Sequence, residues 1–345
     1  MEASNDPPGP AKAEPEESSA KPIHVSYYMN NGVLSVRETD LKDAYELKEE
    51  IRRGDFGPVF KVVQRTTGQA AEAKFKRLPR FVRRQEALRE IEMLFLFAPH
   101  PNLLLLHDAY QMLDSKEIVL ITEPLQGCSL LEWLVSGKER VTERICAGYL
   151  RQLCSALKHL HAASIMHLDL KPESLQLACS GELKLTGFAV ARRCGEEPSL
   201  LRGDAEFSAP EQLGSEAATI NTDMWPVGLL AIVVLSGVSP FWASTKEEMV
   251  QKVISATWVF PDSFSSISKG AKDFISKLVK KSAETRMSAA LCLDHAWLDG
   301  TAAEKPLSMA TLKEFWGRYK SEKPASYVHR FPKSEKAKQS EDEKK

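Results

Sequence analysis

The side chains best suited to chemistry lie in one short run, Met166 to Leu177, which reads M-H-L-D-L-K-P-E-S-L-Q-L. It places an aspartate, Asp169, two positions before a lysine, Lys171. A carboxylate can accept a proton from a hydroxyl group, and an ammonium group can stabilise negative charge that develops beside it. The alternative is that both side chains only shape the backbone of this loop, and we favour that interpretation.

Further motifs share a fixed order around this run. They are G-D-F-G with Gly54 and Gly57, A-E-A-K ending in Lys74, helical Glu90, L-K-L-T-G-F at 183–188, A-P-E at 209–211, D-M-W-P-V-G at 223–228, and Arg286 before H-A-W-L. This order is that of the protein-kinase signatures. The chain therefore resembles the protein kinase family across residues 45–298.

The catalytic-loop motif also indicates a branch of that family. H-L-D-L-K-P-E, with Leu168 where most kinases have Arg, resembles the calcium/calmodulin-dependent type, in particular myosin light-chain, death-associated, titin and obscurin kinases. A-K-F-K at 73–76 and the ending D-H-A-W-L agree with this branch, and Lys171 is the choice of serine/threonine kinases. Without that Arg no guanidinium can bind an activation-loop phosphate. We therefore expect no control by phosphorylation of the 187–211 loop.

The resemblance implies an α+β fold with two lobes, a small β-rich one and a larger helical one. Apolar periodicity agrees with it. Five strands are expected between 45 and 125, with one helix at 81–97, and helices dominate from 129 onward. We expect 1–44 to be a disordered arm in which Asn31-Gly32 could turn a short hairpin, 45–298 to be the kinase-like domain, and 299–345 to be a charged tail that could hold a helix.

Roles for the cleft residues follow from the same resemblance. Lys74 and Glu90 would form the ion pair that holds the nucleotide phosphates, or alternatively a purely structural salt bridge. Asp169 would accept the proton of a substrate hydroxyl, and Lys171 would steady the transferred phosphoryl group. If ATP is bound, the residues expected to contact it are Gly54, Gly57, Val59, Ala73, Lys74, Glu90, Thr122, Glu123 and Leu125.

The two side chains that should hold magnesium are missing. Ser174 and Gly187 occupy their positions, and neither supplies a charged ligand. Four other departures affect the same cleft. They are Arg52 for the first phosphate-loop glycine, where it would crowd the phosphates, Gln176 beneath the adenine, Ala189 for a hinge glycine, and Asp204 for a threonine. We expect no metal ligands and no magnesium binding, and ATP binding is in doubt.

These losses predict a catalytically impaired pseudokinase that acts as a protein-binding scaffold or regulator. The alternative is an active or weakly active ATP-dependent serine/threonine kinase that uses Lys74 and Asp169. The two are distinguished by nucleotide binding with and without magnesium.

The segment 307–320 carries Trp316 near Lys313, Arg318 and Lys320. It occurs where related light-chain kinases have an autoinhibitory, calmodulin-binding tail, and a basic helix with an aromatic anchor suits that mode of recognition. Gly317 within the segment argues against it. We favour a helix packed on the large lobe, with calmodulin binding as the alternative.

Net charge, apolar run length and cysteine spacing indicate which partners and which cellular location to expect. A net charge of -1 gives no attraction to nucleic acid or to anionic membranes. The longest apolar run, 228–238, is shorter than the roughly twenty residues of a membrane span. The six cysteines lack metal spacing, and the Pro-rich start is no signal peptide. We expect a cytoplasmic protein with reduced thiols and with protein partners.

Overall fold

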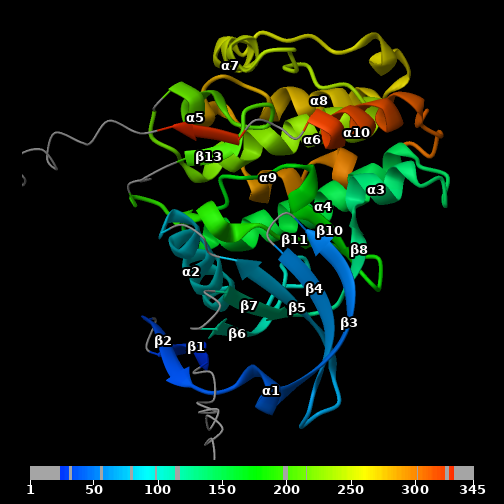
Figure 1. Cartoon of the computed structure of the whole chain (residues 1–345). Helices are drawn as coiled ribbons and strands as arrows, with labels where there is room; N and C mark the ends of the chain where they lie inside the picture. Colours follow the sequence, from blue (N-terminus) through cyan, green and yellow to red (C-terminus); the bar gives the residue numbers. More distant parts are fainter. Residues whose placement is uncertain are drawn as a thin grey trace, which may run out of the picture.

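The computed structural model describes residues 24–322 and 326–329, apart from 31–32, 55–56, 78–80, 98, 113–116, 197–200, 215 and 301. A β-sheet forms one lobe and helices form most of the other (Figure 1). The α+β, two-lobed fold expected from the motifs is therefore confirmed. The disorder expected for residues 1–22 lies outside the described residues.

The small lobe is a sheet of seven described strands in the order β2-β1-β6-β7-β5-β4-β3, with every pair antiparallel. A single turn of helix, α1 (Leu41–Ala44), leads into β3. The strands are β1 (His24–Asn30), β2 (Val33–Glu38), β3 (Tyr45–Gly54), β4 (Gly57–Gln64), β5 (Ala70–Arg77), β6 (Leu106–Met112) and β7 (Glu117–Thr122).

The hairpin β1–β2 enlarges the sheet beyond the five strands expected, and it lies within residues 1–44, the segment expected to be a disordered arm. β1 pairs with β6, and the Tyr27 hydroxyl donates to Gln111 Oε1 at 2.5 Å. Tyr27 is 5 % exposed. Burial of this aromatic ring against the sheet explains why the segment from residue 24 is ordered.

Helix α2 (Phe81–Leu96) carries Glu90 and connects the two lobes. Its buried face holds Ala87, Ile91 and Leu94, which recur at helical spacing. The same helix contacts the turn at Phe188–Val190 in the large lobe. The position of Glu90 is thereby fixed relative to both lobes.

The large lobe is mainly helical, and its centre is α6, in which every residue is buried. None of the helices in the described part of the chain is long and apolar enough to span a membrane. Its helices are α3 (Leu130–Val135), α4 (Glu143–Ala162), α5 (Pro210–Gly214), α6 (Met224–Ser236), α7 (Lys246–Ser255), α8 (Lys269–Leu278), α9 (Ala289–Leu293) and α10 (Ala310–Glu322). Its strands are β8 (Leu125–Ser129), β9 (Ile165–Met166), β10 (Leu175–Ala178), β11 (Leu183–Leu185), β12 (Arg192–Arg193), β13 (Leu201–Asp204) and β14 (Ser326–His329).

Two buried polar contacts hold the large lobe around the cleft. Arg286 and Glu211 form a two-bond ion pair at 2.6 and 2.7 Å, with side chains that are 0 % and 5 % exposed. The Asp223 carboxylate accepts from the backbone amides of His167 and Leu168 at 2.9 and 2.8 Å. Both contacts agree with the resemblance, and the second one fixes the backbone just before Asp169.

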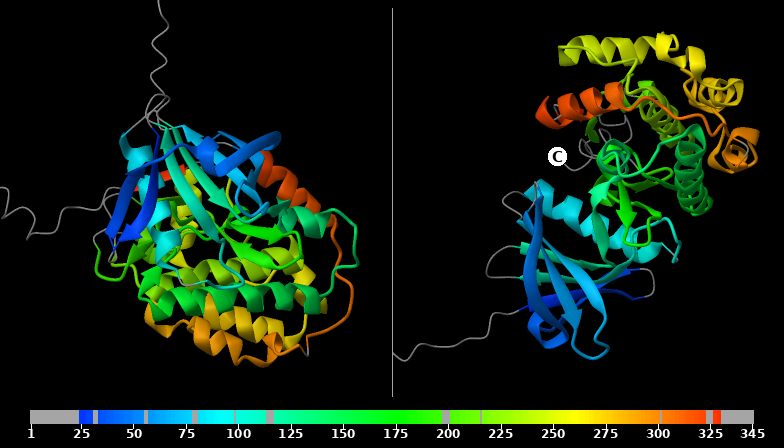
Figure 2. Two further views of the ribbon diagram at one scale, coloured as in Figure 1. Left: turned by 90° about the horizontal axis from the view of Figure 1, so that it is seen from below. Right: turned by 90° about the vertical axis from the view of Figure 1, so that its right-hand side faces the viewer.

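The tail after residue 300 is packed against the large lobe. Helix α10 lies beside α3 and α6 (Figures 1 and 2), and it buries Leu312, Phe315, Trp316 and Tyr319 in the main core. The strand β14 then pairs with β13 in the segment before A-P-E. The helix expected in the tail is present and is packed, as favoured from the sequence.

Candidate active-site cleft

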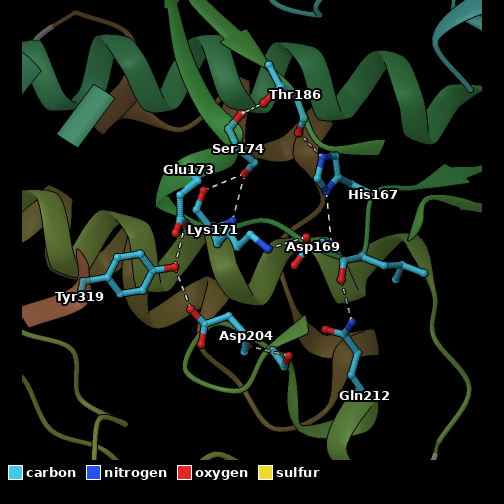
Figure 3. A network of polar contacts seen from close by, with 11 residues as sticks. His167, Asp169, Lys171, Glu173, Ser174, Thr186, Asp204, Gln212 and Tyr319 are labelled. Atoms are coloured by element: carbon cyan, nitrogen blue, oxygen red, sulfur yellow. Dashed lines mark hydrogen bonds and ion pairs between the residues drawn. The ribbon is translucent and has the colours of Figure 1, made fainter. Parts of the chain in front are cut away.

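The predicted base and its lysine lie together on the loop before β10. Lys171 Nζ donates to Asp169 Oδ2 at 2.7 Å (Figure 3). Burial raises the pKa of Asp169, and the Lys171 ammonium opposes that rise. Both side chains line a cavity of about 230 Å³ between the lobes, together with Lys74, Glu90 and Gly187. The arrangement brings together the residues expected at the centre of the site.

The two positions expected to hold a metal are also adjacent. A Cβ built on Gly187 would lie 3.7 Å from Ser174 Cβ. The Ser174 hydroxyl donates to the Lys171 carbonyl oxygen at 2.7 Å and accepts from the Lys171 amide at 3.0 Å (Figure 3). This hydroxyl is therefore committed to the backbone of the loop, and Gly187 has no side chain. These residues do not fit magnesium, which prefers several oxygen ligands including carboxylates.

The ion pair to Glu90 involves a different lysine from the one expected. Lys76, two positions after Lys74 on β5, pairs with the Glu90 carboxylate. Both lysines are on the cleft face of the strand because side chains alternate along it. Glu90 is 4 % exposed; burial raises its pKa, but the lysines of β5, Lys76 first, outweigh this and lower it. The structure thus retains a strand-to-helix ion pair, but not through Lys74.

Lys74 itself has a perturbed ammonium group. Its pKa is lowered to about 8, first by burial and then by the neighbouring charge of Lys76. Two adjacent ammonium groups compete for one carboxylate here, and Lys76 makes the contact. Lys74 therefore loses its proton at a lower pH than an ordinary lysine does.

The residues expected to contact a nucleotide do not all face the cleft. Val59 is opposite Lys74 in the sheet and is buried, and Gly57 must be glycine because a Cβ there would lie 2.3 Å from the Phe75 carbonyl oxygen. Ala73 lies on the other face of β5, in the cluster with Val62 and Val119, and so does not share the face of Lys74.

The connection between the lobes runs from Thr122 through Glu123 to Leu125. Thr122 is buried opposite Glu72. The Glu123 carboxylate is bound to Lys184 at 2.8 Å. The amide of Leu125, a residue expected to contact ATP, donates to Glu72 Oε1 at 3.0 Å.

Arg52 does not crowd the phosphate end of the cleft as expected. Its guanidinium binds both oxygens of Glu72, with Nη1–Oε1 at 3.1 Å and Nη2–Oε2 at 2.5 Å. Gly54, at the end of the same strand, pairs with Gly57. The Gln176 amide donates to the Glu173 carbonyl oxygen at 2.8 Å. We call the end of the cleft at Leu125, where the adenine of a nucleotide would lie, the base end. Filled by Arg52 and Glu72, it does not fit adenine.

A residue of the tail reaches the same loop. The Tyr319 hydroxyl is 2.8 Å from both Glu173 Oε2 and Asp204 Oδ2 (Figure 3). Burial, and then the charge of Glu206, raise the pKa of Asp204 to about 7. Helix α10 is therefore bound to the catalytic loop and to the end of β13.

Leu168 lies where most relatives would have a cation. It adopts φ 65° and is buried with Met166 and Val190. The Gln212 side chain donates to its carbonyl oxygen at 3.0 Å. The start of the 187–211 loop thus contacts an apolar cluster here, and Leu168 supplies no cation to it.

Sequence reasoning missed Glu72, Lys76 and Tyr319. Strand alternation could have placed Glu72 and Lys76 on the face of Lys74, because all three are separated by two positions. The choice of partner could not be read from that alternation. Tyr319 follows Phe315 at helical spacing, which indicated a packed helix but gave no sign of the carboxylates it meets.

Known proteins with similar sequences and structures are protein kinases. The protein kinase domain family matches residues 45–298. The chain is 34 % identical over 325 residues to smooth-muscle myosin light chain kinase of Gallus gallus, and 34 % identical over 288 residues to myosin light chain kinase 3 of Homo sapiens. These matches cover 92 % and 81 % of this chain. A titin homolog of Caenorhabditis elegans is 35 % identical over 266 residues, or 76 % of this chain.

Among solved structures, the autoinhibited serine kinase domain of the giant muscle protein titin matches with a TM-score of 0.73 and 29 % identity. That match covers 81 % of this chain and 88 % of the titin chain. The chain spans only 17 %, 35 % and 1 % of the three sequence relatives' own lengths. The family matches most of the chain, its motifs lie in order and its cleft residues are assembled, so the chain belongs to the protein kinase domain family.

Proposed function

We propose that this protein is a catalytically impaired member of the family that acts as a protein-binding scaffold or regulator. The proposal rests on the two positions expected to hold a metal, because neither offers a free side-chain ligand. Ser174 gives its hydroxyl to the Lys171 backbone, and Gly187 offers no ligand. Phosphoryl transfer depends on metal ions that neutralise charge on the phosphates, and these residues would not hold them.

The substrate side of the cleft also supports an impaired state. Tyr319 meets Glu173 beside the catalytic loop, and Arg318 binds Glu206 at 3.0 Å. The matched titin domain is described as autoinhibited. A tail held at this place would keep a peptide substrate from the Asp169 carboxylate. Calmodulin binding at 307–320 stays an alternative, and it would require Trp316, now 8 % exposed, to leave the core.

The second candidate is a serine/threonine kinase with low activity. It is favoured by the retained Asp169–Lys171 pair and by the retained ion pair of Glu90. In that case Asp169 would accept the proton of the substrate hydroxyl, as in active relatives.

A phosphotransfer assay separates the two candidates. The full chain is incubated with radiolabelled ATP, a serine/threonine peptide library and either magnesium or manganese. We expect no transfer above that of the Asp169→Asn variant, because both lack metal-assisted charge stabilisation. Transfer that is abolished by Asp169→Asn would establish the active kinase instead.

A further inference from the structure

The strand β5 places one acidic side chain in the cleft beside its two lysines. Glu72, Lys74 and Lys76 occupy every second position of β5, and both lysines line the cavity between the lobes. Glu72 therefore points to the same side, one two-residue repeat, or roughly 6–7 Å, nearer to the connection between the lobes. It is 3 % exposed, so its carboxylate needs partners within the protein.

Those partners are a backbone amide and a planar cation. Glu72 Oε1 accepts from the Leu125 amide, and both carboxylate oxygens accept from the two terminal nitrogens of Arg52. Arg52 comes from β3, on the far side of β4, where it is opposite Val59. Its guanidinium thus extends across the cleft face of β4 to reach the connection. Two parallel bonds make this the strong, planar form of a carboxylate–guanidinium contact.

The space that remains in the cleft lies elsewhere. The cavity of about 230 Å³ is lined by residues of the catalytic loop, of α2 and of the end of β5 from Lys74 onward, and neither Arg52, Glu72 nor Leu125 belongs to its lining. The end of the cleft at Leu125 is filled by the protein's own side chains. An adenine ring there would meet an amide that already has an acceptor and a carboxylate that accepts but cannot donate.

We propose that the base end of this cleft is a guanidinium site, occupied by Arg52, and that its ligand class is planar guanidinium and amidinium cations rather than adenine. Glu72 supplies the charge and the pair of acceptors, and the Leu125 amide orients one of its oxygens. The proposal goes beyond the proposed function, because binding at this end is measured whether or not the chain transfers phosphate.

The test removes the internal occupant and offers a free one. Arg52→Ala in the full chain is titrated with methylguanidinium, methylammonium and adenosine, by calorimetry and by thermal shift. We expect saturable binding of methylguanidinium, at least about tenfold tighter than methylammonium because only the former makes two parallel bonds, and no binding of adenosine. Wild type, whose own arginine competes, should bind methylguanidinium at least about tenfold more weakly than the variant.

Two further variants make the result specific. Arg53→Ala removes the neighbouring arginine of β3, whose exposed side chain pairs with Glu50, and it should create no site. Arg52→Ala with Glu72→Gln keeps the shape but removes the charge, and it should lose methylguanidinium binding. Adenosine binding by Arg52→Ala that equals methylguanidinium binding would overturn the proposal, as would cation binding no tighter than that of Arg53→Ala.

Should Arg52→Ala not fold alone, its recovery is followed by circular dichroism with each cation present. Recovery with methylguanidinium but not with methylammonium supports the site. Equal recovery with the two cations, or none with either, overturns it.

Discussion

Two side chains in the cleft, Ser174 and Glu72, satisfy backbone groups that a ligand or a metal site would need. Ser174 binds the amide and carbonyl of Lys171, and Glu72 binds the amide of Leu125. Each contact removes a donor or an acceptor from the cleft. The proposed impairment of nucleotide chemistry can therefore arise from single side chains, while the loop that carries Ser174 is itself ordered.

Restoring the metal positions alone should not restore nucleotide binding. Ser174→Asn with Gly187→Asp supplies metal ligands, and aspartate is among the residues that adopt a positive φ most often, although the φ of 89° at position 187 strains any side chain. We expect no magnesium-dependent ATP binding in calorimetry until Arg52→Gly and Glu72→Ala are added to open the base end. Equal ATP affinity of the two-residue and four-residue variants would contradict this.

The neighbouring lysines of β5 should differ in their effect on stability. Lys76→Met leaves the Glu90 carboxylate buried without its close partner, which costs about 3–5 kcal/mol. Lys74→Met removes an ammonium whose pKa falls to about 8 on folding, so it should stabilise the chain at pH 7, by at most about 3 kcal/mol. Urea unfolding of the two variants measures both effects.

The difference in stability between Lys74→Met and wild type should also depend on pH. Between about pH 8 and 10.5 an unfolded Lys74 holds a proton that the folded form lacks, so wild-type stability gains with rising pH. The advantage of Lys74→Met over wild type should shrink across that window. An advantage that stays constant from pH 7 to 10.5 would be inconsistent with a lowered pKa.

Helix α10 is the element that the proposed function places over the substrate side of the cleft. It is held by an apolar face in the core and by the Tyr319 hydroxyl between two carboxylates. A phenol has one proton to donate, so only one of Glu173 and Asp204 can accept it. The other contact is favourable when its carboxyl is protonated, which makes docking of the helix sensitive to pH.

Docking of α10 should weaken as the pH rises from about 5 to about 7. Burial first, and then the charges of Glu206 and Glu173, raise the pKa of Asp204 from its ordinary 3.8 to about 7, although the hydrogen bond from Tyr319 opposes the rise. The docked state therefore holds an extra proton in that window, beside the Lys171 ammonium. Hydrogen exchange of α10, corrected for intrinsic rates, should accelerate by up to about tenfold per pH unit between pH 5 and 7.

Asp204→Asn is the control for this effect. Its amide cannot titrate, so exchange of α10 should lose most of its dependence on pH and keep only the part that comes from Glu173, whose pKa is also raised by burial. Identical corrected exchange of the wild-type helix at pH 5 and pH 8 would show that the three-residue contact does not govern docking.

The molecule as a whole joins a sheet lobe, a helical lobe and a packed tail, and its parts were foreseeable to different degrees. The catalytic-loop and A-P-E motifs indicated both lobes, and two of the motif residues, Glu211 and Arg286, pair in the structure. The hairpin at Asn31-Gly32 was only suggested, because its alternation is weak and its burial depends on β6. The contact between Arg52 and Glu72 joins strands that are not neighbours, and no local pattern encodes that distance.

The added hairpin should contribute to the stability of the whole chain. Deleting residues 1–38 uncovers the edge of β6 and removes the buried Tyr27 ring, at a cost of at least about 2 kcal/mol. Deleting residues 1–22 leaves both strands intact and serves as the matched control. Equal free energies of unfolding for the two truncations would mean that β1–β2 adds nothing.

A calorimetric titration of ATP into the full chain, with and without magnesium, tests the impaired cleft most directly. Ser174 and Gly187 provide no metal ligands, and Arg52 with Glu72 fills the base end. We therefore predict no heat of binding up to about 1 mM ATP, whether or not magnesium is present. Magnesium-dependent binding in the micromolar range would contradict the impaired cleft and would favour an active kinase.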